Sequence, residues 1–171
     1  MRAFVALDLP DRAIRALEPV IEALPLGRPV DPDQLHLTLA FLDDQTEDRL
    51  EDLHLELEAM RAAPFHLRFD GLGTFGGGRP RLAFAAVAED PYLSELRRLV
   101  RRAASQSGIR LPEERFTPHI TLMRCRAQDR PVLPVFEDRP DFTARSFSLF
   151  SSTLHPEGAR YERLATYPLT G

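Results

Sequence analysis

Apolar residues follow two periodicities along the chain, one typical of helices and one typical of strands. Between residues 11 and 24 an apolar residue recurs every three or four positions, which predicts an amphipathic helix that stops at Pro25. The same spacing predicts helices over residues 46–63 and 90–108, with Thr46 and Asp90 in position to cap them. The pattern therefore predicts three helices, each with one apolar face.

Strands are expected where apolar and polar residues alternate, or where a short apolar run lies between turn signals. The expected strands cover residues 1–10, 35–42, 65–70, 81–88, 116–126, 142–154 and 160–167. Gly76–Gly78 is expected to form a flexible hairpin turn, and the last two strands are joined through His155–Gly158. Because hairpins are mixed among helices, the order predicts an α+β fold and not a regular parallel α/β fold.

A short motif occurs twice on predicted strands, as His36-Leu-Thr-Leu and, 83 residues later, as His119-Ile-Thr-Leu. Side chains alternate across a strand, so His36 shares a face with Thr38 and His119 shares a face with Thr121. The apolar residues of each motif face the other way. If these apolar faces pack against helices, both His-Thr pairs line a common groove.

Two imidazoles in one groove suit acid-base chemistry on a phosphodiester. Histidine's ordinary pKa of about 6.5 lets one ring accept a proton while the other, when charged, donates one. Threonine hydroxyls can donate hydrogen bonds to the non-bridging phosphate oxygens, and no metal or cofactor is implied. The chance of two such motifs in this composition is on the order of 10⁻⁴. Structural histidines bonded to neighbouring threonines remain the alternative.

Composition limits the class of protein. With 171 residues and 43% hydrophobic residues, the chain can form one globular domain and is not disordered. No apolar run approaches the roughly 18 residues that cross a bilayer, and the opening residues lack a signal-peptide pattern. The single Cys125 can form no internal disulfide and cannot supply a structural zinc site. These features indicate a reducing compartment, which we expect to be the cytoplasm.

Charge is distributed unevenly along the chain. Residues 79–130 hold 11 Arg against 6 acidic residues, whereas the formal net charge of the whole chain is −4. Proteins that coat long nucleic acids usually need a broad basic face, because their affinity depends on neutralising many phosphates. This distribution favours a protein that binds a few phosphates.

The chain resembles the two-histidine phosphoesterases, and specifically the bacterial and archaeal RNA 2′,3′-cyclic phosphodiesterases, also called 2′-5′ RNA ligases. The resemblance runs in order along essentially the whole chain. It rests on residues 1–10, 36–42, Gly73-Thr-Phe before Arg79-Pro-Arg81, 116–124 and 161–169.

The resemblance implies one bilobal domain over residues 1–171. Each of two pseudo-symmetric lobes has an antiparallel sheet backed by helices, and each contributes one His-x-Thr-x motif to a central cleft. It also implies hydrolysis of a terminal 2′,3′-cyclic phosphate to a 2′-phosphate, with RNA ends or short oligonucleotides as partners. A monomer is expected.

The resemblance also implies roles for individual residues. His36 is expected to donate a proton to the departing 3′ oxygen, and His119 to activate water. Thr38 and Thr121 are expected to hold the phosphate together with Arg124. Because Arg124 lies five residues after His119, an undistorted strand would turn it to the opposite face, so a bulge or the strand end must bring it round.

The chain departs from the family in the walls of the expected cleft. Many members have a tryptophan in the strand after the glycine-rich turn, but this chain has no Trp. Phe41, Phe75 and Phe116 are the candidates for stacking on a base. Arg79 and Arg81 are candidates for contacts to the RNA backbone.

Two other functions stay open on the residues alone. The first is a non-catalytic RNA- or nucleotide-binding module that keeps the cleft but not the turnover. The second is a metal-dependent phosphatase built on Asp31, Asp33, Asp43 and Asp44, whose carboxylates also fit ordinary caps and turns. Reversible 2′-5′ ligation is a possible second activity of the same histidines.

Overall fold

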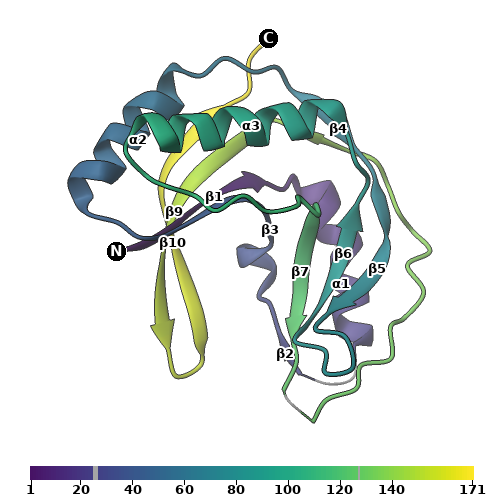
Figure 1. Ribbon diagram of the computed structural model, residues 1–171. Coiled ribbons are helices and arrows are strands. Elements are labelled where there is room, and N and C mark those ends of the chain that lie inside the picture. The colour runs from purple at the N-terminus through teal and green to yellow at the C-terminus, as the bar shows by residue number, and fades with distance from the viewer. Residues whose placement is uncertain (25–26, 127) are drawn as a thin grey trace.

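The computed structural model describes residues 1–24, 27–126 and 128–171 (Figure 1). Its helices are α1 (Asp11–Ala23), α2 (Glu47–Ala59), α3 (Pro91–Gln106) and the short 3-10 helix η1 (Pro32–Gln34). Its strands are β1 (Arg2–Asp8), β2 (Arg28–Pro29), β3 (His36–Asp44), β4 (Phe65–Leu67), β5 (Phe69–Phe75), β6 (Leu82–Val87), β7 (His119–Arg124), β8 (Phe142–Ala144), β9 (Ser146–His155) and β10 (Gly158–Pro168). None of the described helices has the length and apolar character needed to cross a membrane.

Eight strands form one antiparallel sheet. Its order is β10, β9, β1, β3, β7, β6 and β5, and β2 pairs with β7 outside this path. One half of the sheet consists of β10, β9, β1 and β3, and the other half of β7, β6 and β5. The two halves are joined between β3 and β7 by one residue pair, Leu37 with Ile120. The β9–β10 hairpin and β7 therefore lie on either side of β3 (Figure 1). β4 and β8 form a separate two-stranded sheet.

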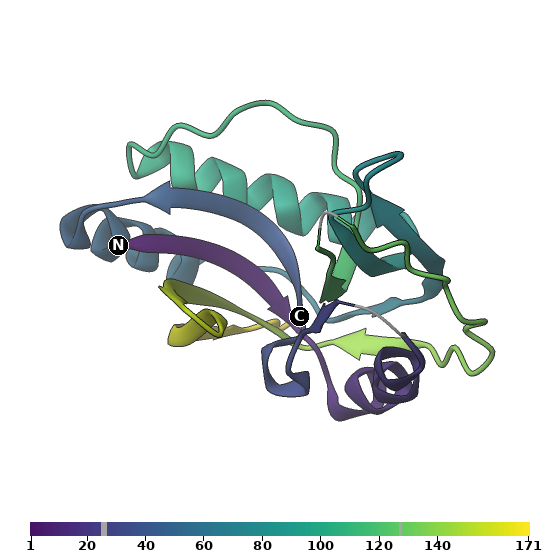
Figure 2. The same cartoon turned by 90° about the horizontal axis from the view of Figure 1, so that it is seen from below.

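The helices bury their apolar faces against the large sheet. Figure 1 shows α2 and α3 running along its upper side, and Figure 2 shows α1 apart from α3, beside the other end of the sheet. The helical side chains that are most buried are Leu17 of α1, Leu53 and Leu57 of α2, and Leu93, Leu96 and Val100 of α3. Thr46 caps α2 by accepting a hydrogen bond from the backbone N–H of Arg49, and Asp90 caps α3 in the same way. The sheet thus buries one face and leaves the other free for chemistry.

The α+β class and the three helices are confirmed, with differences at the helix ends. α2 ends at Ala59 and not at residue 63, since its C-cap residue Met60 already has an extended backbone conformation. α1 ends at Ala23, and the expected stop at Pro25 lies outside the described residues. The equivalence of two lobes that the resemblance implies stays a prediction.

Two expected strands are each divided in two. Residues 65–70 separate into β4 and β5, and residues 142–154 into β8 and β9, because β4 and β8 pair with each other away from the large sheet. The glycine turn is confirmed, since Gly76 and Gly77 have φ angles of 112° and 60°. The last two strands are joined by a tighter turn than expected, at Pro156–Glu157.

Candidate active site

The contact between β3 and β7 brings the two His-Thr motifs together. Leu37 and Ile120 are cross-strand partners, and both are fully buried. Because the two strands are antiparallel, this register sets the histidine of each motif beside the threonine of the other motif. All four polar side chains alternate with the buried pair and so face the opposite side. In a regular antiparallel pair such diagonal neighbours lie about 7–8 Å apart. β3 and β7 are bridged only at Leu37 and Ile120, so the shared cavity, and not this spacing, shows that the two histidines face one space.

A β-bulge brings Arg124 to the same side. The register of β6 against β7 shifts between Ala83 and Phe84, so that Leu122 is an extra residue in β7. Past this bulge the alternation of β7 is reversed, and Arg124 shares a face with Thr121. This is the kind of irregularity that the position of Arg124 in the sequence required.

A second bulge acts on β3. Its register against β1 shifts between Val5 and Ala6, so that Leu39 is an extra residue. Phe41 therefore pairs with Phe4 and rejoins the face that carries Thr38. The Phe41 side chain is 60% exposed, which leaves its ring accessible to a ligand.

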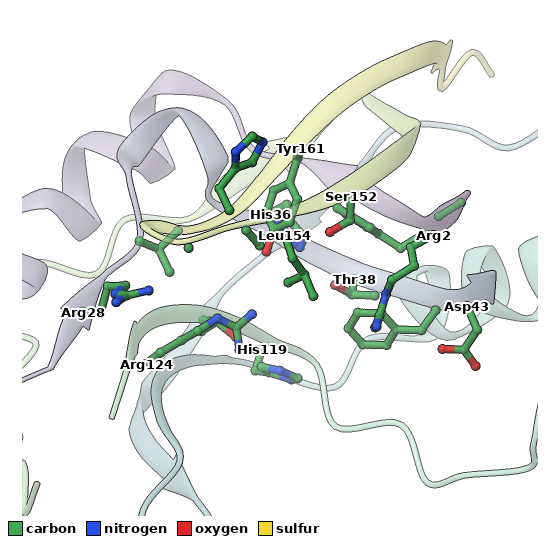
Figure 3. A pocket seen from close by; sticks show the side chains of 18 residues that line it. Arg2, Arg28, His36, Thr38, Asp43, His119, Arg124, Ser152, Leu154 and Tyr161 are labelled. Atoms are coloured by element: carbon green, nitrogen blue, oxygen red, sulfur yellow. The ribbon is translucent and has the colours of Figure 1, made fainter. Parts of the chain in front are cut away.

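A cavity of about 470 Å³ lies over the two motifs. Its lining includes the predicted residues His36, Thr38, Phe41, His119, Thr121 and Arg124. Arg28 and Arg124 lie toward one end of the cavity, Arg2 and Asp43 toward the other, and the histidines lie between them (Figure 3). The structure therefore brings the residues of both motifs into one cavity, with two arginines at one end and an arginine and a carboxylate at the other.

Each catalytic candidate ring is held by the same backbone interaction. Nδ1 of His36 lies 2.7 Å from the carbonyl oxygen of Gln34, and Nδ1 of His119 lies 2.7 Å from that of Thr117. Since a carbonyl can only accept, Nδ1 carries the hydrogen in both rings. When a ring is neutral, its Nε2 therefore has a free lone pair that can take a proton.

Aromatic side chains surround both imidazoles. Phe4 stacks on the ring of His36 at a centroid distance of 4.9 Å, and Tyr161 meets the same ring edge-on at 5.3 Å. Phe75 and Phe84 pack edge-on against His119 at 4.9 and 5.4 Å. This packing fixes the orientation of both rings without using their Nε2 atoms.

Burial lowers the pKa of His36 to about 4. The hydrogen bond to the Gln34 carbonyl and the charge of Asp8 raise this pKa, while the charges of Arg124 and His119 lower it further. His36 is therefore neutral in the free protein at neutral pH. The mutual influence of the two histidines also means that they share one electrostatic environment.

Three groups that can bind phosphate have no protein partner. Within the described residues, the side chains of Thr38, Thr121 and Arg124 make no hydrogen bond or ion pair with another protein group. Two hydroxyl donors and a guanidinium thus remain available to an anion in the cavity.

Phe75 and Phe116 do not line this cavity. Phe75 supports His119, as described above, and Phe116 faces a separate depression where the guanidinium of Arg97 lies 4.6 Å from its ring centroid. Of the three candidates for stacking on a base, Phe41 is the one that lines the cavity in the described structure, and its ring is exposed there.

Arg79 and Arg81 also lie elsewhere. They line a different hollow with Cys125, beside the glycine turn. Sequence position alone did not separate them from Arg124, because the turn between β5 and β6 carries them away from the histidines.

The four carboxylates of the metal hypothesis lie in separate places. Asp31 caps η1 by accepting a hydrogen bond from the backbone N–H of Asp33 at 3.0 Å. Asp44 lies 3.7 Å from the N-terminal ammonium, and Asp43 lines the cavity. Among the residues that the structure describes, no three His, Cys, Asp or Glu side chains are grouped so as to hold a metal ion.

Sequence reasoning missed several cavity residues. Arg28 and His155 line the cavity but belong to no periodic pattern or repeat, so no signal marked them. Arg2 also lines the cavity, and it lies in the first expected strand, which marked the segment but not this side chain. Tyr161 opens the closing segment of the family resemblance, which marked the segment but not the contact of its ring with His36.

Comparisons with known proteins agree with this geometry. The sequence profile of the 2′-5′ RNA ligase superfamily matches residues 6–153. The chain belongs to the 2′-5′ RNA ligase superfamily.

Individual relatives match over nearly their full length. The RNA 2′,3′-cyclic phosphodiesterase of Thermus thermophilus is 36% identical over 183 residues, which cover 100% of this chain and 91% of that protein. The enzyme of the same name from Archaeoglobus fulgidus is 30% identical, covering 98% of this chain and 99% of its own length. The crystal structure of Escherichia coli LigT complexed with 3′-AMP superposes with a TM-score of 0.82 at 30% identity, covering 99% and 98% of the two chains.

Proposed function

We propose that this protein is an RNA 2′,3′-cyclic phosphodiesterase that hydrolyses a terminal 2′,3′-cyclic phosphate to a 2′-phosphate. The observation that carries this function is the single cavity that contains both histidines, both threonines and Arg124. The names of the relatives from Thermus thermophilus and Archaeoglobus fulgidus support the same activity.

The reaction needs one proton acceptor and one proton donor. Nε2 of His119 takes a proton from water, whose oxygen attacks phosphorus as the bond to the 3′ oxygen breaks. Nε2 of His36 gives a proton to that departing oxygen, which leaves a 3′ hydroxyl and a 2′-phosphate. Thr38, Thr121 and Arg124 donate hydrogen bonds to the non-bridging oxygens as their charge grows.

The donor role of His36 depends on the bound substrate. A ring with a pKa of about 4 carries little charge at neutral pH. An anionic phosphate beside the ring favours its charged form and offsets the repulsion from Arg124. Substrate binding therefore raises the pKa of His36, so that the ring takes up from the solvent the proton that it passes to the departing oxygen.

Every step uses groups of the chain itself, so the activity is expected to need no metal and no cofactor. Purified protein should open the cyclic phosphate of a short RNA in the presence of EDTA, and a product assay should find 2′-phosphate and not 3′-phosphate ends. Loss of activity in EDTA would favour a metal-dependent phosphatase. Binding without turnover would favour a non-catalytic module.

Removing either histidine should slow turnover strongly. His36→Ala and His119→Ala are each expected to reduce kcat by roughly 10² to 10⁴, the usual contribution of a general acid or base. His66→Ala is the matched control, because His66 lies on β4 and bonds to Thr143 of β8 outside the cavity. Unchanged rates in both cavity variants, with the fold intact, would remove the histidines from the mechanism.

The biological setting follows from the same features. The whole of residues 1–171 acts as one domain and as a monomer, since one chain supplies both motifs and the strands between them. A single cysteine fits the cytoplasm. The two histidines can also run the reaction backwards, so 2′-5′ ligation of RNA ends is the second activity to assay.

A further inference from the structure

Arg28 and Arg124 form a pair at one end of the cavity. Strand β2 is two residues long, and its Arg28 is the cross-strand partner of Arg124 at the end of β7. Cross-strand partners point to the same side of a sheet, and both side chains line the cavity (Figure 3). Two guanidinium groups therefore lie at one end of the active site.

Neither guanidinium has a counterion among the residues that the structure describes. Within the described chain, Arg28 and Arg124 make no ion pair and no hydrogen bond to a carboxylate. The β9–β10 hairpin comes close to Arg28 at Gly158, where an added Cβ would lie 3.6 Å from Nη1 of Arg28. Two unneutralised guanidinium groups repel each other, and an anion with several acceptor oxygens relieves that repulsion.

This anion differs from the reacting phosphate. Arg124 is close enough to His36 to lower its pKa, whereas Arg28 is not among the groups that shift it. Arg28 therefore lies farther from His36 than Arg124 does (Figure 3). A cyclic mononucleotide has only the reacting phosphate, so it leaves Arg28 without a partner.

The opposite end of the cavity is less suited to a phosphate, because it carries charges of both signs. Arg2 lies there with the carboxylate of Asp43 and the exposed ring of Phe41. A carboxylate repels phosphate, while an exposed ring suits stacking with a base. The charges therefore direct the terminal base toward Phe41 and the rest of the RNA toward Arg28.

We infer that Arg28, beside Arg124, binds the phosphodiester on the 5′ side of the terminal nucleotide while Arg124 holds the reacting phosphate, so that an RNA end of two or more nucleotides is a better substrate than a free cyclic mononucleotide. This inference rests on the proposed phosphodiesterase function. It assigns to Arg28 the binding of a second phosphate, outside the acid-base machinery.

Three substrates test the assignment on the full chain. They are a nucleoside 2′,3′-cyclic phosphate, the dinucleotide that ends in the same cyclic nucleotide, and that dinucleotide with an uncharged methylphosphonate linkage. The charged dinucleotide should have a kcat/KM about 10-fold or more above the other two, as expected for a charge-assisted contact. The methylphosphonate should behave like the mononucleotide.

Arg28→Gln should remove the advantage of the charged dinucleotide and leave the mononucleotide rate within about 2-fold of the unmutated protein. The mononucleotide rate thus also reports that the variant is folded. Arg160→Gln is the matched control, because Arg160 lies in β10 between the cavity residues Ala159 and Tyr161, pairs with Glu157 and does not itself line the cavity.

The outcomes separate the two proposals. If none of the substrates is opened, the phosphodiesterase function itself fails. If the mononucleotide is opened but the charged dinucleotide has no advantage, or if Arg28→Gln slows both substrates equally, the assignment of Arg28 is overturned.

Discussion

His36 lies in the candidate active site, in an environment that removes its charge. Phe4 and Tyr161 bury its ring, and their packing explains why its pKa falls to about 4. A neutral ring suits a base in the free protein, whereas the proposed mechanism uses His36 as the acid. If His119 is removed, the residual kcat/KM should fall with rising pH if His36 is the acid and rise with pH if His36 is the base.

The His119→Asn variant makes that response visible. The unmutated protein should show a bell-shaped pH profile for kcat/KM, whichever histidine is the acid. In His119→Asn only His36 is left to titrate. If His36 donates the proton, the residual kcat/KM should fall about 10-fold per pH unit once the pH exceeds the pKa of His36. A residual rate that rises with pH over the same range would make His36 the base.

The lowered pKa of His36 also predicts a loss of stability in acid. The unfolded chain binds a proton at His36 near pH 6.5, while the folded chain binds it only near pH 4. Stability contributed by the neutral ring is present above pH 6.5 and is lost as the pH falls from there toward 4.

Urea unfolding at pH 7 and pH 4.5 measures this effect. The unmutated protein should lose roughly 2 kcal/mol more than His36→Asn between these two pH values, an order-of-magnitude figure for a half-buried ring. Equal losses in the two proteins would show that burial of His36 does not oppose its protonation.

At the scale of the elements, periodicity predicted the strands and helices but not their irregularities. The repeat His36-x-Thr38 and His119-x-Thr121 was readable because an ideal strand has a period of two. The bulges at Leu39 and Leu122 break that period, and they arise from pairing with β1 and β6, which a local pattern does not contain. β2 escaped prediction for the same reason, since it is a strand only through its partner β7.

The position of Arg124 shows how far the sequence could go. Its distance from His119 required an irregularity, but only the register of β6 shows that Leu122 is the extra residue. Phe116 shows the opposite case, because its place next to a histidine motif did not reveal that Arg97 covers its ring.

Gly73 connects β5 to the active site by close packing. A Cβ on Gly73 would lie 2.6 Å from the ring of Phe84 on β6, and that ring packs against His119. Gly73→Ala should push the ring toward His119 and lower kcat about 10-fold or more, since small displacements of catalytic groups are costly. Steady-state kinetics measures this change.

Gly78→Ala is the control for Gly73→Ala. A Cβ on Gly78 meets nothing within 4 Å, although it lies in the turn between the same two strands. It should leave kcat unchanged. A Gly73→Ala protein with normal kcat would show that Phe84 can move without disturbing His119.

At the scale of the whole molecule, folding brings three arginines together at one cavity. The chain has a formal net charge of −4, yet Arg2, Arg28 and Arg124 all line the active site. Of these three arginines, Arg124 alone comes from the Arg-rich segment 79–130. The uneven charge along the sequence therefore predicted that few phosphates are bound, but it did not predict which arginines bind them. Arg2, Arg28 and Arg124 are far apart in the sequence and come together only in the folded chain. The composition of a local segment could not predict this.

This arrangement predicts how activity depends on the length of the RNA. Each RNA phosphate that binds an arginine increases the affinity for the RNA. It also makes the binding constant depend more steeply on salt concentration. Because the chain as a whole has a negative net charge, RNA phosphates that extend beyond the cavity are not expected to add affinity. For RNAs from one nucleotide to about ten, kcat/KM should rise over the first two or three nucleotides and then stay constant, with a salt dependence that also stops increasing. A kcat/KM that keeps rising along the whole series would require a basic track outside the cavity, and would contradict recognition confined to the RNA end.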